Sequence, residues 1–486
     1  MAPTVAELVR QRDAAADADL VELRVDTVAR PDADVIDGAL AGRRVPVVVT
    51  CRPAWEGGRF RGSEEERRRL LASALEQGAE WVDVEWRARF HELLGPHTCQ
   101  RIVLSSHDFE AFPPDLDERV TSMLQSDVGI VKVAATASRL GDCVRLLDVA
   151  RTVEPPRRGV FIAMGPYGVA SRVCAAKFGS VWTYAGAAEG IGQMGPRELV
   201  GRYGFRQITE QTSIYGIVGS PVSHSVSPAM HNAAFQRAGV DAVYLPLPAV
   251  DADDFVAFAR GLGLSGASIT IPFKVDLAAR VDEIDEVAHE IGAVNTVRVE
   301  EGRWLGRNTD VAGFLRPLRD RGIGLGGLRA SVLGAGGSAR AVVAGLTRSG
   351  AVVTVHARSR SRAEALTARF GWDVRVGEWP LAGDAWDLLV NCTPIGMHPT
   401  TGALPVARTI FTGLAGPPRT VYDLVYNPID TPLLRGARES GCTTIDGLEM
   451  LVAQAQDQFE WWTGVRPAAD LMREAAVTRL AEFQTS

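Results

Sequence analysis

Residues 330–340, Ala330-Ser331-Val332-Leu333-Gly334-Ala335-Gly336-Gly337-Ser338-Ala339-Arg340, decide the fold of the second half of this chain. An apolar run that predicts a strand is followed by a glycine-rich turn and by residues that open a helix. This order is typical of a dinucleotide-binding fold, in which the helix N-terminus holds the pyrophosphate. A purely structural loop is the alternative. The residues expected to contact the dinucleotide are Gly334, Ala335, Gly336, Gly337 and Ser338.

The end of the next expected strand indicates which dinucleotide binds. That strand, residues 351–356, ends roughly twenty residues beyond the glycine turn, where an NAD-binding fold carries Asp or Glu. The chain has Ala357-Arg358-Ser359-Arg360-Ser361-Arg362 there instead. Because guanidinium groups bind phosphate well, Arg358 and Arg362 predict a site for the 2′-phosphate of NADP(H). A solvated basic loop is the alternative.

Length and composition indicate a globular protein that acts on small molecules rather than on nucleic acid or a membrane. A chain of 486 residues, 46% hydrophobic and 23% charged, exceeds one ordinary core, so two or three domains are expected. A formal net charge of -7 gives no attraction to nucleic acid or to an anionic membrane. The six cysteines are scattered, without CxxC pairs or His at zinc spacing. This pattern predicts reduced thiols, no metal site and a cytoplasmic location.

Up to about residue 203, apolar runs alternate with helical stretches and predict βα units around a parallel sheet. Polar side chains fall within or at the ends of these runs, where a (β/α)₈ barrel keeps its active site. A doubly wound sheet is the alternative, and seven runs are one fewer than a closed barrel needs. The runs are residues 20–25, 45–51, 81–86, 101–107, 128–134, 159–164 and 181–186. The polar side chains are Glu22, Arg24, Arg52, Glu85, His107 and Lys132.

A short polar segment, residues 206–213, follows this region, and a fresh strand is expected from Ile214. We expect the first domain to span residues 1–208. The second, an αβ unit, is expected over 213–316 and the dinucleotide domain over 317–445. Residues 446–486 begin with a long amphipathic helix that is expected to pack back onto the second domain.

Lysine is scarce in this chain. Three of its 52 basic residues are lysines, and two of these, Lys132 and Lys274, lie in apolar, strand-like segments. Arginine cannot lose its proton, so only lysine can form an imine or donate a proton near neutral pH. We therefore expect amine chemistry at both positions. Burial of Lys132 is expected to lower its pKa and to supply a neutral amine that attacks a ketone. We assign no role to the third lysine, Lys177.

Motifs along residues 214–486 resemble shikimate dehydrogenase. They are the run from Tyr215 to Pro228, Thr270-Ile271-Pro272-Phe273-Lys274, Gly292-Ala293-Val294-Asn295-Thr296, Asn308-Thr309-Asp310, the glycine turn and Gln454. The resemblance implies that Lys274 and Asp310 form the catalytic pair and that the cofactor is NADP(H). It also implies that Ser225 and Ser227 bind the substrate carboxylate. The residues implied around the ring hydroxyls are Thr270, Asn295, Asp310, Tyr426 and Gln454. Ala357 stands where the family often has Asn. The chain therefore departs from the family in part of the contact with the adenosine phosphate.

Motifs along residues 1–210 resemble type I 3-dehydroquinate dehydratase. They are Glu22-Leu23-Arg24-Val25-Asp26, Thr50-Cys51-Arg52 followed by Glu56-Gly57-Gly58, Ser106-His107-Asp108-Phe109, Val131-Lys132-Val133, Ser171-Arg172 and Gly192-Gln193. The resemblance implies that Lys132 forms the imine, with His107 as general acid and base assisted by Glu56. Arg172 is implied to bind the carboxylate. The residues implied to position hydroxyls are Glu22, Arg24, Arg52 and Gln193.

Two departures from the dehydratase pattern stand out. Glu189 lies four residues before Gln193, where many relatives have Ser. The family's first barrel strand precedes the helix that starts here near Thr4, so we expect that strand to be encoded upstream of Met1. If it is absent, the dehydratase half is expected to be impaired while the dehydrogenase half works.

The sequence therefore predicts a (β/α)₈-type barrel fused to a two-domain α/β dehydrogenase with a Rossmann-like NADP domain. The expected activities are dehydration of 3-dehydroquinate to 3-dehydroshikimate and reduction of that ketone to shikimate. The alternatives are an enzyme with only its dehydrogenase half active, a quinate dehydrogenase, and a metabolite-sensing regulator without catalysis. The regulator predicts loss of catalytic groups, and Lys132, His107, Lys274 and Asp310 are all present.

Overall fold

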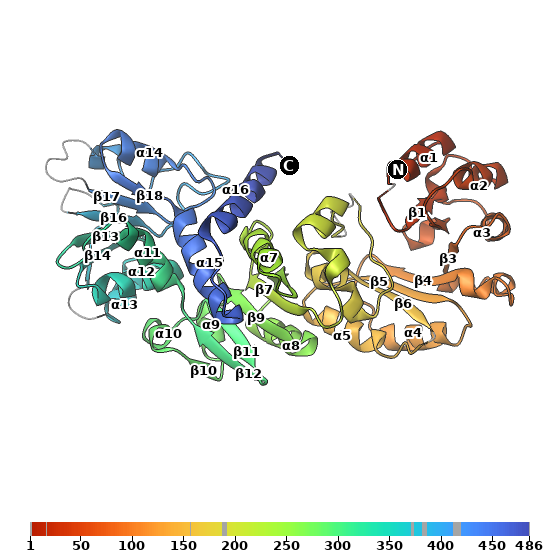
Figure 1. Cartoon of the computed structure of the whole chain (residues 1–486), viewed down its shortest axis with the longest axis horizontal. Coiled ribbons are helices and arrows are strands. Elements are labelled where there is room, and N and C mark those ends of the chain that lie inside the picture. Colours follow the sequence, from red (N-terminus) through yellow and green to blue (C-terminus); the bar gives the residue numbers. More distant parts are fainter. Residues whose placement is uncertain are drawn as a thin grey trace. The chain divides into compact units, whose positions relative to one another are not determined.

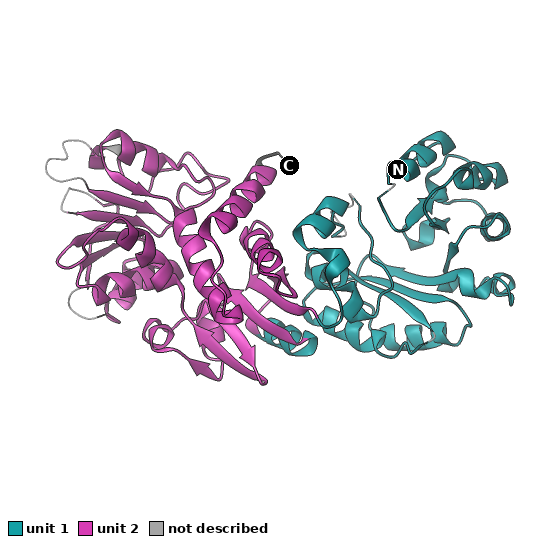
Figure 2. Cartoon of the chain, viewed as in Figure 1, with its two compact units in different colours: residues 1–211, 253–262 teal, residues 212–252, 263–486 magenta. Residues whose placement is uncertain are grey.

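A computed structural model describes the chain except for residues 1, 16, 156, 187–191, 371–373, 382–385, 412–418 and 486. Glu189 lies outside the described residues. The chain divides into two compact α/β units (Figure 2). Unit 1 comprises Met1–Gln211 with Asp253–Leu262, and unit 2 comprises Thr212–Ala252 with Gly263–Ser486.

Unit 1 is built on one parallel sheet whose six strands follow each other in chain order (Figure 1). A doubly wound sheet reverses its order at a switch point, whereas sequential parallel neighbours are the arrangement of a (β/α)₈ barrel. Among the described residues the strands curl into part of a barrel, with β1 and β6 at its edges. The strands are β1 (Val21–Arg24), β2 (Val47–Thr50), β3 (Trp81–Glu85), β4 (Ile102–Asp108), β5 (Ile130–Thr136) and β6 (Arg158–Met164).

The first three helices of unit 1 begin at residues whose side chains cap them. The Thr4 side chain accepts a hydrogen bond from the Glu7 amide, which confirms the helix start expected there. Ser63 and Glu66 form a capping box at the start of α3. The helices are α1 (Val5–Ala14), α2 (Ala33–Leu40), α3 (Glu64–Glu76), α4 (Leu116–Leu124), α5 (Gly141–Ala150), α6 (Val169–Val173) and α8 (Ala252–Leu262).

The strand predicted over residues 181–186 is not formed. This stretch makes only isolated bridges, from Ser180 to Gly159 and from Ala185 to Met194. Its large side chains nevertheless face the core: Trp182 packs edge-on against Trp81, with ring centroids 5.7 Å apart. The apolar character of this run therefore reflects side-chain packing rather than a backbone ladder.

The described residues of unit 2 form two sheets of six strands each. The first has the order β10-β12-β11-β9-β7-β8 and mixes parallel with antiparallel pairs. Its strands are β7 (Ser213–Gly219), β8 (Ala242–Pro248), β9 (Leu264–Ile269), β10 (Glu283–Ile284), β11 (Thr296–Glu300) and β12 (Arg303–Arg307). The strand expected from Ile214 is thus confirmed as β7.

The second sheet of unit 2 is parallel, with the order β15-β14-β13-β16-β17-β18. Its strands are β13 (Arg329–Leu333), β14 (Val352–His356), β15 (Val374–Val376), β16 (Leu388–Asn391), β17 (Thr420–Asp423) and β18 (Thr443–Ile445). The order reverses at β13, which β14 and β16 flank. Such a switch point opens a crevice at the carboxyl ends of the strands, where doubly wound sheets bind nucleotides.

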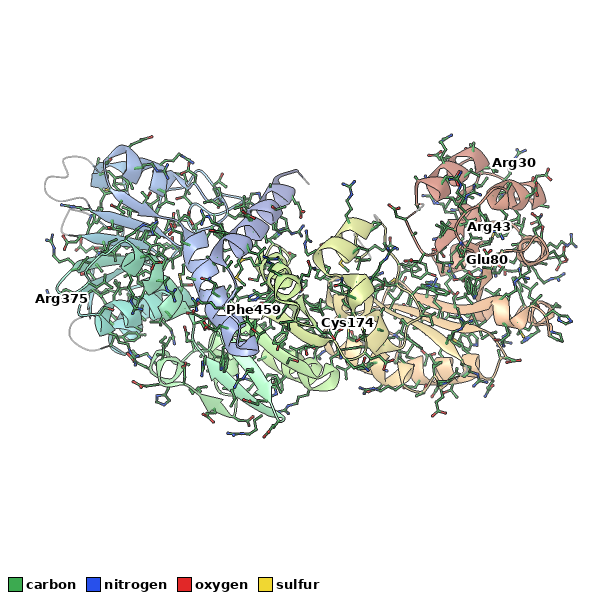
Figure 3. The ribbon with its side chains drawn as sticks, in the orientation of Figure 1. Arg30, Arg43, Glu80, Cys174, Arg375 and Phe459 are labelled. Atoms are coloured by element: carbon green, nitrogen blue, oxygen red, sulfur yellow. The ribbon has the colours of Figure 1, made fainter. Side chains whose placement is uncertain are left out.

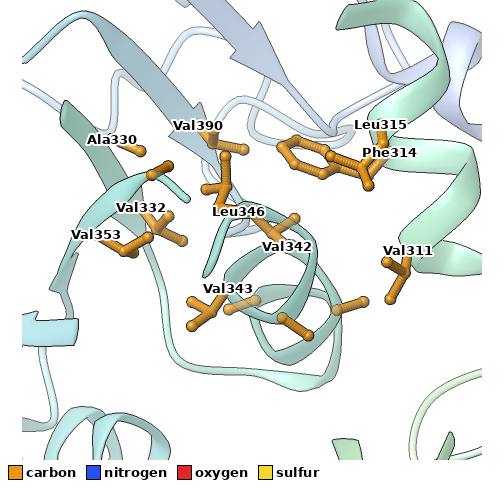
Figure 4. Packing of buried hydrophobic residues seen from close by; sticks show 14 of the residues in the cluster. Val311, Phe314, Leu315, Ala330, Val332, Val342, Val343, Leu346, Val353 and Val390 are labelled. Atoms are coloured by element: carbon orange, nitrogen blue, oxygen red, sulfur yellow. The ribbon is translucent and has the colours of Figure 1, made fainter. Parts of the chain in front are cut away.

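Helices cover both sheets of unit 2. They are α7 (Ser227–Ala238), α9 (Lys274–Ala278), α10 (Glu286–Ile291), α11 (Asp310–Asp320), α12 (Gly337–Arg348), α13 (Arg360–Thr367), α14 (Pro432–Glu439), α15 (Gly447–Thr463) and α16 (Ala469–Thr485). In the core of the nucleotide-binding part, Val342 and Leu346 of α12 pack among Phe314 of α11 and the strand residues Val332 and Val390 (Figure 4). This packing fixes the helix that follows the glycine turn.

The tail helix α15 packs onto the first sheet of unit 2, as its amphipathic pattern predicts. Phe459, labelled in Figure 3, is fully buried, and the centre of its ring lies 4.9 Å from the ring centre of Phe235 on α7. Tyr215 of β7 belongs to the same core cluster. Because of this packing, Gln454 on the same helix is brought to the site described below.

Candidate active sites

Lys132 lies on β5 and points into unit 1, where 3% of its surface is exposed. Its Nζ donates a hydrogen bond to Asp83 Oδ2 at 3.0 Å and lies 4.0 Å from Glu22 Oε1. The ammonium also sits 4.4 Å from the centre of the Tyr184 ring. Two carboxylates, from strands β1 and β3, and one aromatic face therefore surround a single amine.

The prediction that burial gives Lys132 a lowered pKa is wrong, because the structure gives a raised pKa. Burial by itself lowers the pKa of this amine, but the charge of Asp83, with contributions from Tyr184 and Glu22, outweighs burial and raises it. Asp83 comes from β3 and is not visible in the apolar strand that carries Lys132. Lys132 is consequently a charged group in this network and has to release a proton before it can act as a nucleophile.

A buried network of charges extends from Asp83. Ser105 Oγ donates to Asp83 Oδ1 at 2.6 Å, and Arg52 Nη1 lies 3.1 Å from the same oxygen. Arg52 also donates to Glu85 Oε1 at 2.7 Å. Asp83 and Ser105 were therefore not among the predicted site residues. Glu85 was predicted as a polar strand residue but not as a partner of Arg52. The alternation Val82-Asp83-Val84-Glu85 was the available signal, because alternate residues of a strand face the same side.

His107 and Glu56 form a buried pair. Glu56 Oε1 lies 2.9 Å from both the backbone nitrogen and Nδ1 of His107. Burial raises the pKa of Glu56 to about 8, against the lowering effect of Arg52. Burial, together with Arg52 and Lys132, lowers the pKa of His107 well below its ordinary value. His107 is therefore neutral near pH 7 and able to accept a proton.

The other predicted residues of unit 1 have varied surroundings. Arg24 is held by Asp26 through two hydrogen bonds of 2.8 Å. Arg172 is buried on α6, and burial lowers its pKa to about 10. Thr50 Oγ1 donates to Glu22 Oε1 at 2.8 Å, which holds that carboxylate toward Lys132. Gln193 lies next to the stretch that the structure leaves undescribed, and the Lys177 Nζ donates to the carbonyl of Glu210.

In unit 2 the structure brings Lys274 and Asp310 together. Lys274 Nζ lies 2.5 Å from Asp310 Oδ2, and Asn295 Nδ2 donates to Asp310 Oδ1 at 2.8 Å. The same Asn295 nitrogen lies 3.4 Å from Gln454 Oε1. Four residues from widely separated parts of the sequence thus form one polar cluster. Asn295, Asp310 and Gln454 are almost completely buried, so the cluster is held rigidly.

The remaining predicted substrate residues border the same part of unit 2. Ser225 Oγ accepts a hydrogen bond from the Ser227 amide at 3.2 Å just before α7. Thr270 directly follows β9, four residues before Lys274. Tyr426 packs against the cluster formed by β7, α7 and α15, and burial raises its pKa.

All the predicted dinucleotide residues line one cavity of about 510 Å³ at the switch point of the second sheet. Arg358 and Arg362 line it together with the glycine turn. Gly334 has φ = 106°, and a Cβ there would lie 3.2 Å from the carbonyl oxygen of Cys392. Only glycine fits this turn, and Gly336 at the N-cap of α12 leaves the helix amides open. The cavity therefore fits a dinucleotide carrying an additional phosphate.

The cavity adjoins the polar cluster of unit 2. Ile271, one residue after Thr270, lines it and is 66% exposed. A Cβ built on Gly337 would lie 3.9 Å from Lys274 Cδ. A proton donor and a hydride source can therefore act on the two atoms of one substrate carbonyl group.

A bifunctional enzyme matches both halves of the chain. The chain is 33% identical to the chloroplastic bifunctional 3-dehydroquinate dehydratase/shikimate dehydrogenase of Arabidopsis thaliana, over 93% of this chain and 79% of the relative. The chain belongs to this bifunctional family. A family model described as type I 3-dehydroquinase matches residues 1–210. Models of the shikimate dehydrogenase substrate binding domain and of the shikimate 5'-dehydrogenase C-terminal domain match residues 217–297 and 447–477.

Single-function relatives match the dehydrogenase part. A shikimate dehydrogenase (NADP(+)) of Symbiobacterium thermophilum is 43% identical over 55% of this chain and 94% of its own length. The structure of shikimate 5-dehydrogenase from Thermus thermophilus in complex with NADP(H) and shikimate superposes with a TM-score of 0.50 at 36% identity. It covers 55% of this chain and 99% of that chain. The family confirms the predicted lyase and NADP-dependent oxidoreductase activities and the α/β fold of both halves.

Within the described part of the chain, no helix combines the length and the apolar character that a membrane crossing requires.

Proposed function

We propose that the dehydratase reaction of this bifunctional enzyme proceeds through an imine between Lys132 and the ketone of 3-dehydroquinate. The observation that carries this proposal is the buried Lys132, surrounded by Asp83 and Glu22 one barrel strand away from the His107–Glu56 pair. An amine that a ketone can reach and a neutral base on the neighbouring strand are the two groups that an imine-assisted elimination needs.

The elimination divides between the two groups. Lys132 first transfers a proton from its Nζ to one of the neighbouring carboxylates. The neutral amine then attacks the ketone. The ketone oxygen leaves as water when the imine forms. The imine then withdraws electrons from the adjacent carbon, so His107 can remove a proton from it. The same proton returns to the departing hydroxyl group, which leaves as water, and hydrolysis of the imine releases 3-dehydroshikimate.

The Glu56 contacts indicate the tautomer of His107. Glu56 Oε1 accepts from the His107 backbone N–H, so the same oxygen is suited to accept from Nδ1–H as well. Nε2 then carries the free lone pair and acts as the base. In this proposal Arg172 binds the substrate carboxylate, and Glu22, Arg24, Arg52 and Gln193 position its hydroxyl groups.

In unit 2, we propose that Lys274 donates the proton that completes ketone reduction and that Asp310 holds its ammonium. The bound NADPH supplies the hydride to the carbonyl carbon. Asn295 and Gln454 orient Asp310 and the ring hydroxyls, together with Thr270 and Tyr426, while Ser225 and Ser227 bind the carboxylate. The 2.5 Å contact between Lys274 and Asp310 supports this pairing.

Shikimate is the proposed product rather than quinate. Both Ser225 and Ser227 are present for the carboxylate, and Arg358 and Arg362 in the cavity favour NADP over NAD. Steady-state rates with shikimate and quinate, each with NADP and NAD, decide this point. A higher kcat/KM for quinate with NAD contradicts it.

We further propose that residues 1–208 form the dehydratase domain and 213–316 with 446–486 the substrate domain of the dehydrogenase. Residues 317–445 then form the NADP domain. The six cysteines are free thiols, which supports a reducing compartment, and we propose the cytoplasm. Immunoblots of fractionated cells test the location.

Reduction with borohydride tests the imine. Incubation with 3-dehydroquinate and borohydride is expected to inactivate the dehydratase and to add the ligand mass to the peptide that contains Lys132. Dehydrogenase activity in the same sample is the control, since only reduction of the imine attaches the ligand covalently to the dehydratase site. Full dehydratase turnover without an adduct on Lys132 rejects the mechanism.

A further inference from the structure

Arg67 is a fully buried arginine behind the dehydratase site. It lies on α3, and its guanidinium contacts the Glu85 carboxylate, which is also fully buried. Its other faces are occupied by Glu64 at 2.6 Å and by the Phe90 ring, whose centre lies 4.6 Å away. A buried guanidinium is costly unless it is paired on all sides, so this arrangement holds both Arg67 and Glu85 in place.

Glu85 links Arg67 to the active site. One carboxylate oxygen contacts Arg67, and the other accepts a hydrogen bond from Arg52 Nη1 at 2.7 Å. Glu85 thus has a cation on each side. Burial raises the pKa of Glu85, and the two arginines act against burial. Loss of either arginine therefore favours the protonated, neutral form of Glu85.

Arg52 in turn acts on the imine-forming lysine. Its Nη1 lies 3.1 Å from Asp83 Oδ1, while Asp83 Oδ2 accepts from Lys132 Nζ at 3.0 Å. Charges therefore alternate without a break from Arg67 through Glu85, Arg52 and Asp83 to Lys132. The charge of Arg52 lowers the pKa of Lys132, and the charge of Asp83 raises it. The position of Arg52 therefore affects the pKa of the amine directly.

We propose that Arg67 is a positioning residue of the dehydratase reaction, which keeps Glu85 ionised so that Glu85 holds Arg52 and balances its charge beside Asp83 and Lys132. This inference rests on the proposed role of Lys132 as the imine-forming group. Arg67 itself touches neither Asp83 nor Lys132 in this chain of contacts and acts through Glu85.

The test is the pH profile of dehydratase kcat/KM for Arg67→Met in the full chain. When Glu85 is neutral, no negative charge on Glu85 offsets the positive charge of Arg52. Arg52 therefore repels the Lys132 ammonium more strongly, and the pKa of the amine falls. We expect the acidic limb of the profile to move to lower pH by about one unit, with a fall in maximal kcat of roughly tenfold. A purely structural role lowers the rate equally at every pH.

Four further variants complete the test. Arg67→Lys retains a cation beside Glu85 and is expected to restore the wild-type profile. Glu85→Gln keeps the shape of the side chain and is expected to shift the limb in the same direction, even if Arg67→Met does not fold. Because Arg67 acts through Glu85, the double variant Arg67→Met/Glu85→Gln is expected to shift the acidic limb by the same amount as the single variant Glu85→Gln. Arg69→Met, at a 72% exposed side chain of the same helix, is the matched control.

The outcomes separate this inference from the proposed mechanism. Dehydrogenase kcat and KM of each variant report whether the chain remains intact. If wild-type enzyme forms the Lys132 adduct while Glu85→Gln keeps the wild-type pH profile, the positioning role is overturned and the imine stands. Additive shifts in the double variant also overturn it. If wild-type enzyme forms no adduct on Lys132, both the imine and this inference are rejected.

Discussion

At the residue scale, the two lysines of interest share one chemistry but differ in their surroundings. Lys132 is paired with Asp83 in a completely buried network that contains several further charges. Lys274 is paired with Asp310 alone among the described residues, and 15% of its side chain is exposed beside the cofactor cavity. The first amine must lose its proton to attack a ketone, whereas the second has to carry the proton that it donates. The same side chain therefore serves as nucleophile or acid according to its neighbours.

Glu56 provides a pH-dependent prediction at this scale. Its pKa is raised from 4.5 to about 8, so the carboxyl is protonated at neutral pH and becomes anionic above pH 8. An anionic Glu56 makes His107 a stronger base, so dehydratase kcat is expected to rise through pH 8. Glu56→Gln cannot ionise, and we expect it to lose this rise and to be slower by about 10²-fold.

The measurement is dehydratase kcat between pH 6 and 9.5, with dehydrogenase activity of the same preparation as the control. An inflection near pH 8 that persists in Glu56→Gln assigns the ionisation to another group.

At the element scale, the turn between β13 and α12 determines cofactor binding. The strand ends at Leu333, the helix begins at Gly337, and the three residues between them bring the backbone to the cavity wall. The turn is possible because Gly334 adopts a positive φ that other residues avoid. Ser359 caps α13 by accepting from the Arg362 amide, and Arg358 and Arg362 of the same segment line the same cavity.

Gly334→Ala is therefore expected to weaken the binding of NADPH. The strained φ costs about 1–3 kcal/mol, and the added Cβ meets the Cys392 carbonyl and the Thr393 side chain. We expect the KM for NADPH to rise by roughly tenfold or more, while dehydratase kinetics remain unchanged. Gly324→Ala is the matched control, because a Cβ there has nothing within 4 Å and φ is not in the left-handed region. Equal effects of the two substitutions contradict the role of the turn.

At the scale of the whole molecule, the described catalytic pairs of the two sites lie in different units. Lys132, His107 and their partners belong to unit 1, and Lys274, Asp310 and the cofactor cavity belong to unit 2. The product of the first reaction is the substrate of the second. A single chain therefore carries two consecutive steps.

This independence predicts complementation between inactive variants. Lys132→Arg is expected to lose dehydratase activity, and Lys274→Met is expected to lose dehydrogenase activity by about 10²–10⁴-fold. Each variant alone fails to oxidise NADPH when supplied with 3-dehydroquinate. An equimolar mixture is expected to recover about half the coupled rate of wild-type enzyme at the same total concentration, because each site is present at half strength.

The coupled rate is followed through NADPH absorbance. Wild-type enzyme provides the reference, and each variant is assayed separately for the activity that it retains. No recovery in the mixture, although both variants keep their other activity, shows that the two steps depend on sites of the same chain.

The order of the elements, the family and the residues Lys274, Asp310, Asn295 and Gln454, which gather at one site, are all evident from the amino-acid sequence. Strand and helix periods, caps and glycine turns are local properties, so β1 to β6, the glycine turn and α15 were predictable from short stretches. The run at 181–186 was predicted wrongly because an apolar pattern does not distinguish a backbone ladder from side-chain packing.

Only the tertiary structure decided the charge of Lys132. An apolar strand predicts a lowered pKa for a buried amine, but Asp83 reaches it from a strand about fifty residues earlier in the chain and reverses the shift. The same holds for Arg67, whose link to Lys132 through Glu85, Arg52 and Asp83 joins residues of separate strands and a helix. Electrostatic energies depend on distances between groups, and distances between remote residues are properties of the folded chain, not of any local pattern.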